Sequence, residues 1–135
     1  MALTQDRSIQ ARHTGRLVPL QVAAGALIHL GAIVAVDASG WAVPAADSAG
    51  FAAVGVAQER VDNTSGGNGA RTVCVQKGVF GLANSMSNPL GQAHVGRTAY
   101  VEDDGAVAND SVVNKVAAGA VDEIGDDGLV YVHFA

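Results

Sequence analysis

Apolar residues occur in short runs separated by turn-forming residues along most of this 135-residue chain. The runs are of strand length and lie at residues 27–36, 41–43, 53–58, 98–101, 106–108, 115–124 and 129–134. Residues 72–80 alternate with a period of two, which places valines on one face and smaller or polar side chains on the other. The pattern predicts an all-β domain of about eight to ten strands, a small antiparallel sandwich or barrel of jelly-roll-like form.

Three similar turn sequences separate apolar segments, at residues 36–43, 101–108 and 124–131. Each places an acidic or small polar pair and a glycine between two apolar stretches, and glycine readily takes the positive φ that tight turns require. We therefore predict a β-hairpin at each of the three. Residues 82–95 are rich in Asn, Ser, Pro and Gly and predict a long surface loop. Residues 42–53 have room for one short helical turn, capped at Asp47 and Ser48.

The uncharged run at residues 17–36 is long enough to suggest a membrane span. It contains Pro19, Gly25, His29 and Gly31, begins too late for a signal peptide and lacks a cleavage-like end. We therefore expect no contact with a membrane.

Charge divides the chain into a basic start and an acidic remainder. Before Asp37 there are three arginines and one aspartate, a net charge of +2, whereas the remainder carries five basic and twelve acidic residues, a net charge of −7. Residues 1–20 show no clear period, so we predict an extended N-terminal arm over 1–20 and a single β domain over 21–135. A loose solvated tail is the alternative for the arm. The acidic domain argues against nucleic-acid binding, which requires a basic face.

Candidate chemical groups are scattered. His13, His29, His94 and His133 are isolated in sequence, without the paired spacing typical of metal sites. Cys74 is the only cysteine and has no predicted base beside it. The acidic turns lack the alternating oxygen ligands of a calcium loop, and the glycine-rich stretch at 65–69 lacks the lysine of a phosphate loop. We predict no catalytic residues, no metal and no cofactor.

Ala, Val and Gly dominate the sequence, whereas aromatic residues make up only 4%. A core of such small side chains is modest, and a domain of this kind gains stability by burying further surface in an assembly. We therefore expect a homo-oligomer. The arm can add a strand to a partner's sheet edge, and Arg7, Arg12 and Arg16 are the residues that we expect to pair with carboxylates of that partner.

Three stretches carry a resemblance to a known family: residues 24–31 (AGALIHLG), 53–57 (AVGVA) and 118–132 (AGAVDEIGDDGLVYV). With the Ala/Gly/Val-rich composition and irregular start, residues 20–135 resemble the head decoration, or cement, proteins of tailed bacteriophages. The resemblance implies a non-enzymatic virion protein that binds the capsid exterior as a dimer or trimer. It would staple neighbouring major capsid proteins, after assembly in the host cytoplasm. No family residue is specific enough to transfer.

The competing interpretation is a receptor- or glycan-binding β-module of a phage fibre or baseplate. Such a module is expected to display exposed aromatic side chains or a metal for its ligand, and Trp41 is the only tryptophan of this chain. An enzyme on a similar scaffold would require a general acid or base in a suitable setting, and the sequence indicates none.

Overall fold

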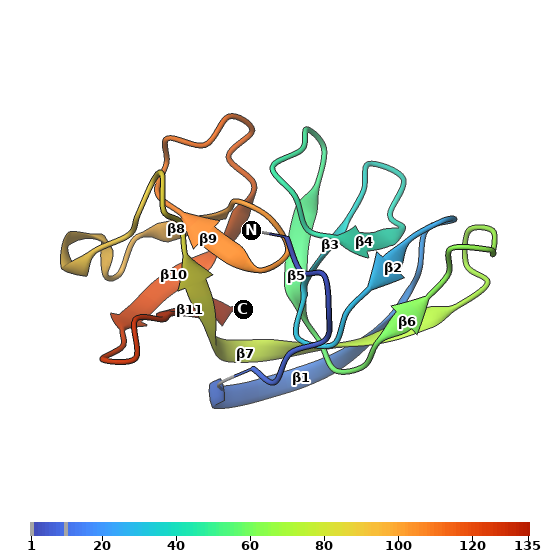
Figure 1. Cartoon of the computed structure of the whole chain (residues 1–135), viewed down its shortest axis with the longest axis horizontal. Helices are drawn as coiled ribbons and strands as arrows, with labels where there is room; N and C mark the ends of the chain where they lie inside the picture. The colour runs from blue at the N-terminus through green and yellow to red at the C-terminus, as the bar shows by residue number, and fades with distance from the viewer. Residues whose placement is uncertain (1, 10) are drawn as a thin grey trace.

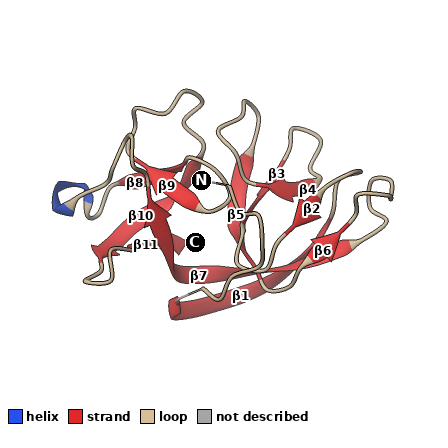
Figure 2. Cartoon of the chain, in the orientation of Figure 1, coloured by secondary structure: helices blue, strands red, loops and turns tan. Residues whose placement is uncertain are grey.

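The computed structural model describes residues 2–9 and 11–135, with the side chains of residues 12–14 left out, and has an all-β fold (Figures 1 and 2). The strands follow in chain order: β1 (Ala11–Gln21), β2 (Leu27–Ile28), β3 (Ile33–Val36), β4 (Ala42–Pro44), β5 (Ala52–Ala57), β6 (Val61–Asp62), β7 (Thr72–Asn84), β8 (Thr98–Val101), β9 (Ala106–Ala108), β10 (Ala117–Ile124) and β11 (Val130–Phe134). The one helical element in the described part is η1 (Gln92–His94), a short 3-10 turn. The predicted all-β class with a barrel-like or sandwich-like arrangement is confirmed.

Five strands form a closed ring, which we call the barrel. The second half of β7 pairs with β11, which is followed in turn by β10, β8 and β9, and β9 returns to β7. Four of these five pairings are antiparallel, and β7 with β9 is parallel. Closure removes the exposed edges that an open sheet of these strands would have.

The remaining strands form an extension of the same sheet, which we call the wing. The first half of β7 pairs with β5, which is followed by β3 and β4, while β1 pairs with β7 along almost its whole length. The short strands β2 and β6 pair separately beside the wing. In Figure 1, β7 and β1 run beneath both halves, so one long strand belongs to barrel and wing alike.

Two apolar clusters correspond to these halves. The larger one centres on the barrel and includes Phe80 and Phe134, whose ring centroids lie 6.4 Å apart. The smaller one lies in the wing and includes Val73 and Val75. Small side chains dominate both clusters, as the composition indicated.

All three predicted hairpins are present. The turns join β3 to β4, β8 to β9 and β10 to β11, each pair antiparallel. In each turn an aspartate accepts backbone hydrogen bonds: Asp37 from Trp41, Asp103 from Gly105 and Asp127 from Leu129. The acidic residues that precede each glycine therefore serve as turn-forming acceptors. Residues 45–51, where a helical turn had room to form, hold bends and turns instead.

The segment expected to form a separate arm has a different place in the structure. Residues 11–21 are β1, an integral strand of the sheet, and residues 3–7 lie against the body. The sequence signal was misleading here because β1 contains Gly15 and Pro19 and does not alternate cleanly. Its register against β7 shifts between Ala11 and His13 and between Thr14 and Leu17, which explains the irregular pattern.

Candidate functional site

The three arginines expected to bind a partner lie in different settings. Arg7 is partly buried within the protein, whereas Arg16 is exposed on β1. The backbone of Arg12 lies in β1, and its side chain lies outside the described part. The structure therefore leaves Arg16 free to meet a partner, while Arg7 is engaged within its own chain.

The strand β1 offers the longest open edge among the described residues. It spans 11 residues and pairs with β7 along one edge, and no strand of the described chain pairs with the other. Leu17 is 56% exposed and stands next to Arg16. Pro19 fits this position, because a proline is tolerated in an edge strand. An open edge presents backbone donors and acceptors to which an extended segment of another chain can add.

The N-terminal segment, residues 3–9, is bound to the body through two adjacent charged residues. Arg7 Nε donates to the Gly31 carbonyl at 3.0 Å, and Nη1 donates to the Gly105 carbonyl at 3.1 Å. Asp6 Oδ1 lies 3.2 Å from His29 Nδ1 and accepts from the Leu30 backbone N–H at 3.3 Å. Because Gly31 precedes β3 and Gly105 precedes β9, Arg7 connects the wing to the barrel.

Gly31 permits this close approach. A Cβ added there would lie 2.6 Å from Arg7 Cγ and 2.8 Å from the Arg7 carbonyl oxygen, and its φ of +85° also favours glycine. The fit of the guanidinium is nonetheless incomplete. Nη2 of Arg7 is buried without a hydrogen-bond partner among the described residues, which costs about 1–3 kcal/mol. The segment is therefore held specifically but not as tightly as its contacts suggest.

Burial shapes the electrostatics of this region. Burial raises the pKa of Asp104, assisted by the nearby charge of Asp103 and opposed by the hydrogen bond from the Leu3 N–H, by His29 and by Arg7. Burial likewise lowers the pKa of Arg7, against the opposing influence of Asp104 and Asp103. The Leu3 N–H to Asp104 Oδ1 distance is 2.8 Å. The segment thus places the positive charge of Arg7 beside carboxylates whose charged form burial would otherwise destabilise.

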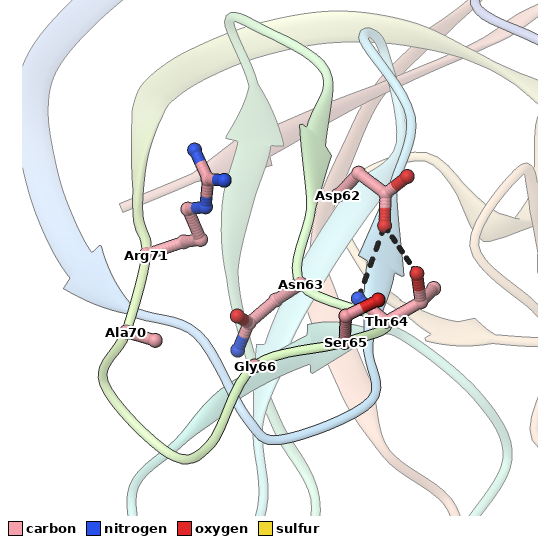
Figure 3. Close-up of a pocket in the computed structure, with 7 residues that line it drawn as sticks. All are labelled: Asp62, Asn63, Thr64, Ser65, Gly66, Ala70 and Arg71. Atoms are coloured by element: carbon pink, nitrogen blue, oxygen red, sulfur yellow. Dashed lines mark hydrogen bonds between the residues drawn. The ribbon is translucent and has the colours of Figure 1, made fainter.

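A polar hollow of about 560 Å³ lies in the loop between β6 and β7 (Figure 3). Asp62 accepts from the Thr64 N–H at 3.0 Å and from its hydroxyl at 2.6 Å, and these bonds lower the pKa of Asp62. The buried Asn63 donates to the carbonyls of Val22, Ala23 and Gly67. These polar groups fix the loop, so the hollow is accounted for by local structure.

The histidines and the cysteine do not converge in the described part of the chain. His29 lies by Asp6, the Nδ1 atom of His94 accepts from the Gly91 N–H, and His133 is exposed on β11. The side chain of His13 lies outside the described residues. Cys74 is a free thiol in β7. Among the described residues no three His, Cys, Asp or Glu side chains gather where they could hold a metal ion.

No protein-family model, curated protein or solved structure matches this chain. The described residues contain no helix long and apolar enough to cross a membrane.

Sequence reasoning singled out Arg7 as a residue that binds a partner, but it missed the contacts that hold the N-terminal segment to the body. Asp6 and Arg7 are adjacent charges in a polar stretch, and Gly31 is one glycine among 17 in the sequence. Asp104 resembles every other turn aspartate in sequence, yet it is 5% exposed. No local pattern reveals the contacts of these four positions, because their partners lie 23 to 101 residues away.

Proposed function

We propose that this protein is a capsid cement protein of a tailed bacteriophage, which binds the outside of an icosahedral head and holds neighbouring major capsid proteins together. The observation that carries the proposal is the open edge of β1, an 11-residue strand with exposed Arg16 and Leu17 beside it. Such an edge binds an extended segment through main-chain hydrogen bonds and requires no deep pocket.

Charge supports the same partner chemistry. The protein has a net charge of −5, yet β1 carries Arg12 and Arg16 and no acidic residue. An acidic strand or loop of the capsid protein would meet Arg16 at the open edge, whereas the rest of the acidic domain would repel it. Complementary charge of this kind fixes the orientation of binding more than it raises affinity.

Because a capsid presents many identical binding sites, modest contacts at each site are sufficient for stable binding. Each copy that touches two capsid subunits binds the second one at high effective concentration, so the pair of contacts is far stronger than either alone. The closed barrel and the continuous strand β7 provide a body that can transmit force between the two contacts without unfolding.

The proposal is tested with phage heads stripped of this protein. Rebinding of the wild-type chain should restore occupancy and raise the temperature at which heads release DNA. Arg16→Ala combined with Leu17→Ala should reduce rebinding about tenfold or more, because a hydrogen bond to a charged group contributes about 1.5–3 kcal/mol. Arg97→Ala, on the barrel, is the matched control and should rebind normally. Heads equally resistant to heat with and without the protein would contradict the proposal.

One observation favours the alternative of a receptor- or glycan-binding module. A hollow of about 700 Å³ on the barrel is lined by Arg97, Thr98, Tyr100 and Asp110, together with Ala93, His94 and Gly96. One partly buried aromatic ring among polar groups is a setting in which a sugar can bind. If Arg97→Ala and Tyr100→Ala abolish attachment to host cells or glycans while Arg16→Ala has no effect on heads, the alternative is correct.

A further inference from the structure

We propose that the groove that holds residues 3–9 is a peptide-binding site, and that in the assembled layer it accepts the N-terminal segment of a second copy of this chain. The inference rests on the proposed function in one respect only, namely that binding to a capsid brings many copies of this chain close together. The groove is formed by the segment before β3 and the turn before β9, on either side of the N-terminal segment (Figure 1). In the isolated chain the groove is occupied by residues 3–9 of the same chain.

The site recognises a specific peptide chemistry. The Arg7 backbone N–H donates to the Leu30 carbonyl at 3.1 Å, as a strand would. Its guanidinium reaches two carbonyls, and Asp6 in the preceding position meets His29 and the Leu30 N–H. Leu3 and Ile9 pack against the wing and barrel clusters at either end of the segment. The ligand is thus an Asp-Arg peptide with a bend at residues 4 and 5 and apolar residues at both ends.

The contacts between the N-terminal segment and the groove do not require both to belong to the same chain. All polar partners of the segment lie 23 or more residues away in sequence. The segment precedes β1, so it can leave and enter another groove while β1 stays paired with β7. Because the exchanged contacts would be identical, the choice between its own groove and a neighbour's depends mainly on effective concentration. Copies fixed side by side on a capsid provide that concentration.

Gly31 determines whether an N-terminal segment can enter the groove. The Cβ of an alanine at this position would overlap the position of Arg7. Gly31→Ala therefore blocks the groove and displaces the segment of the same chain, whereas Asp6→Ala with Arg7→Ala weakens the segment and leaves the groove intact. The two full-length variants are complementary.

The first experiment measures binding of a fluorescent peptide of residues 2–9 to the full-length Asp6→Ala/Arg7→Ala variant by fluorescence anisotropy. We expect saturable binding, at least tenfold weaker with wild-type protein, whose groove is filled. A peptide carrying Arg7→Ala should bind at least tenfold more weakly, and one carrying Ser8→Ala, an exposed position, should bind normally. Circular dichroism checks folding, and the single variant Arg7→Ala replaces the double one if the latter does not fold. Equal binding of all peptides, or none, would overturn the site.

The second experiment mixes the two complementary variants and measures mass by native mass spectrometry. We expect a one-to-one complex in the mixture that neither variant forms alone. Absence of that complex, with both variants folded, would overturn exchange between copies. Neither experiment contains a capsid, so a negative result here leaves the cement proposal standing, and failure to rebind heads leaves the groove standing.

Discussion

At the residue scale, a few buried polar side chains hold together segments that share no strand pairing. Asn63 is 2% exposed and donates to the carbonyls of Val22 and Ala23, which follow β1, and of Gly67 in its own loop. Asp104 is 5% exposed and accepts from Leu3, while its own carbonyl accepts from the Ile33 N–H at 2.8 Å. Each of these residues stands where a loop crosses between elements, so its loss removes hydrogen bonds between segments that lie far apart in the chain.

We expect Asn63→Ala to lower the free energy of unfolding by about 2–3 kcal/mol, because it removes three hydrogen bonds that each contribute about 0.5–1.5 kcal/mol. Urea denaturation measures the effect. Asn68→Ala is the control, since Asn68 is exposed and accepts one bond from the Ala24 N–H, and we expect a loss of less than about 1 kcal/mol. Equal losses in the two variants would show that burial of Asn63 is not the cause.

Asp104 makes stability depend on pH. Since burial raises its pKa above the ordinary value of 3.8, the folded protein binds this proton more tightly than the unfolded chain does. The free energy of unfolding that Asp104 contributes therefore falls as pH rises through the interval between the two pKa values. Asp104→Asn keeps an oxygen acceptor for Leu3 and removes the proton.

We expect Asp104→Asn to become progressively more stable relative to the wild type as pH increases from about 4 toward neutrality. Urea unfolding at several pH values measures the difference. Asp126→Asn removes an exposed turn carboxylate and controls for net charge. If the stability of Asp104→Asn relative to the wild type stays constant with pH, or falls as pH rises, the burial of this charge is contradicted.

At the scale of elements, the structure depends on close approaches between strands that only glycine allows. Gly119 lies in β10, where an added Cβ would overlap the His133 carbonyl of β11. Gly55 in β5 stands in a similar relation to β7, since a Cβ added there would lie 2.5 Å from the Gln76 carbonyl oxygen. Backbone atoms cannot move aside as flexible side chains can, so these glycines determine how tightly the strands pack.

We expect Gly119→Ala to destabilise the protein by about 1–3 kcal/mol, the usual range for overpacking. Thermal unfolding measures the loss. Gly91→Ala is the control, because an added Cβ at Gly91 meets nothing within 4 Å and its φ of −133° suits any residue. If both substitutions are tolerated, the strand spacing at β10 and β11 is looser than the structure shows.

At the scale of the whole molecule, barrel and wing are joined along β7 and again through Arg7 and Asp104. Strand β7 pairs with β5 and β1 in the wing and with β11 and β9 in the barrel. A break in either half therefore removes pairing partners from the same strand. Unfolding of the two halves should be coupled for this reason.

We expect one cooperative unfolding transition, in which the fluorescence of Trp41 in the wing and the far-ultraviolet circular dichroism of the whole chain coincide. Phe80→Ala in the barrel should cost about 3–5 kcal/mol and shift both signals equally. If Trp41 fluorescence changes at a denaturant concentration that leaves circular dichroism unaffected, the wing unfolds separately and the coupling through β7 is wrong.

The sequence by itself determined the local features of this protein. Strand-length apolar runs and aspartate-glycine turns predicted the all-β class and all three hairpins, because period-two alternation and positive φ act within a few residues. Only the tertiary structure decided that residues 11–21 join the sheet as β1, that a parallel pairing of β7 with β9 closes the barrel, and that Arg7 is partly buried between wing and barrel. Arg7 and Gly105 are 98 residues apart. Contacts at such separation depend on the packed shape of the whole chain, and no local pattern encodes them.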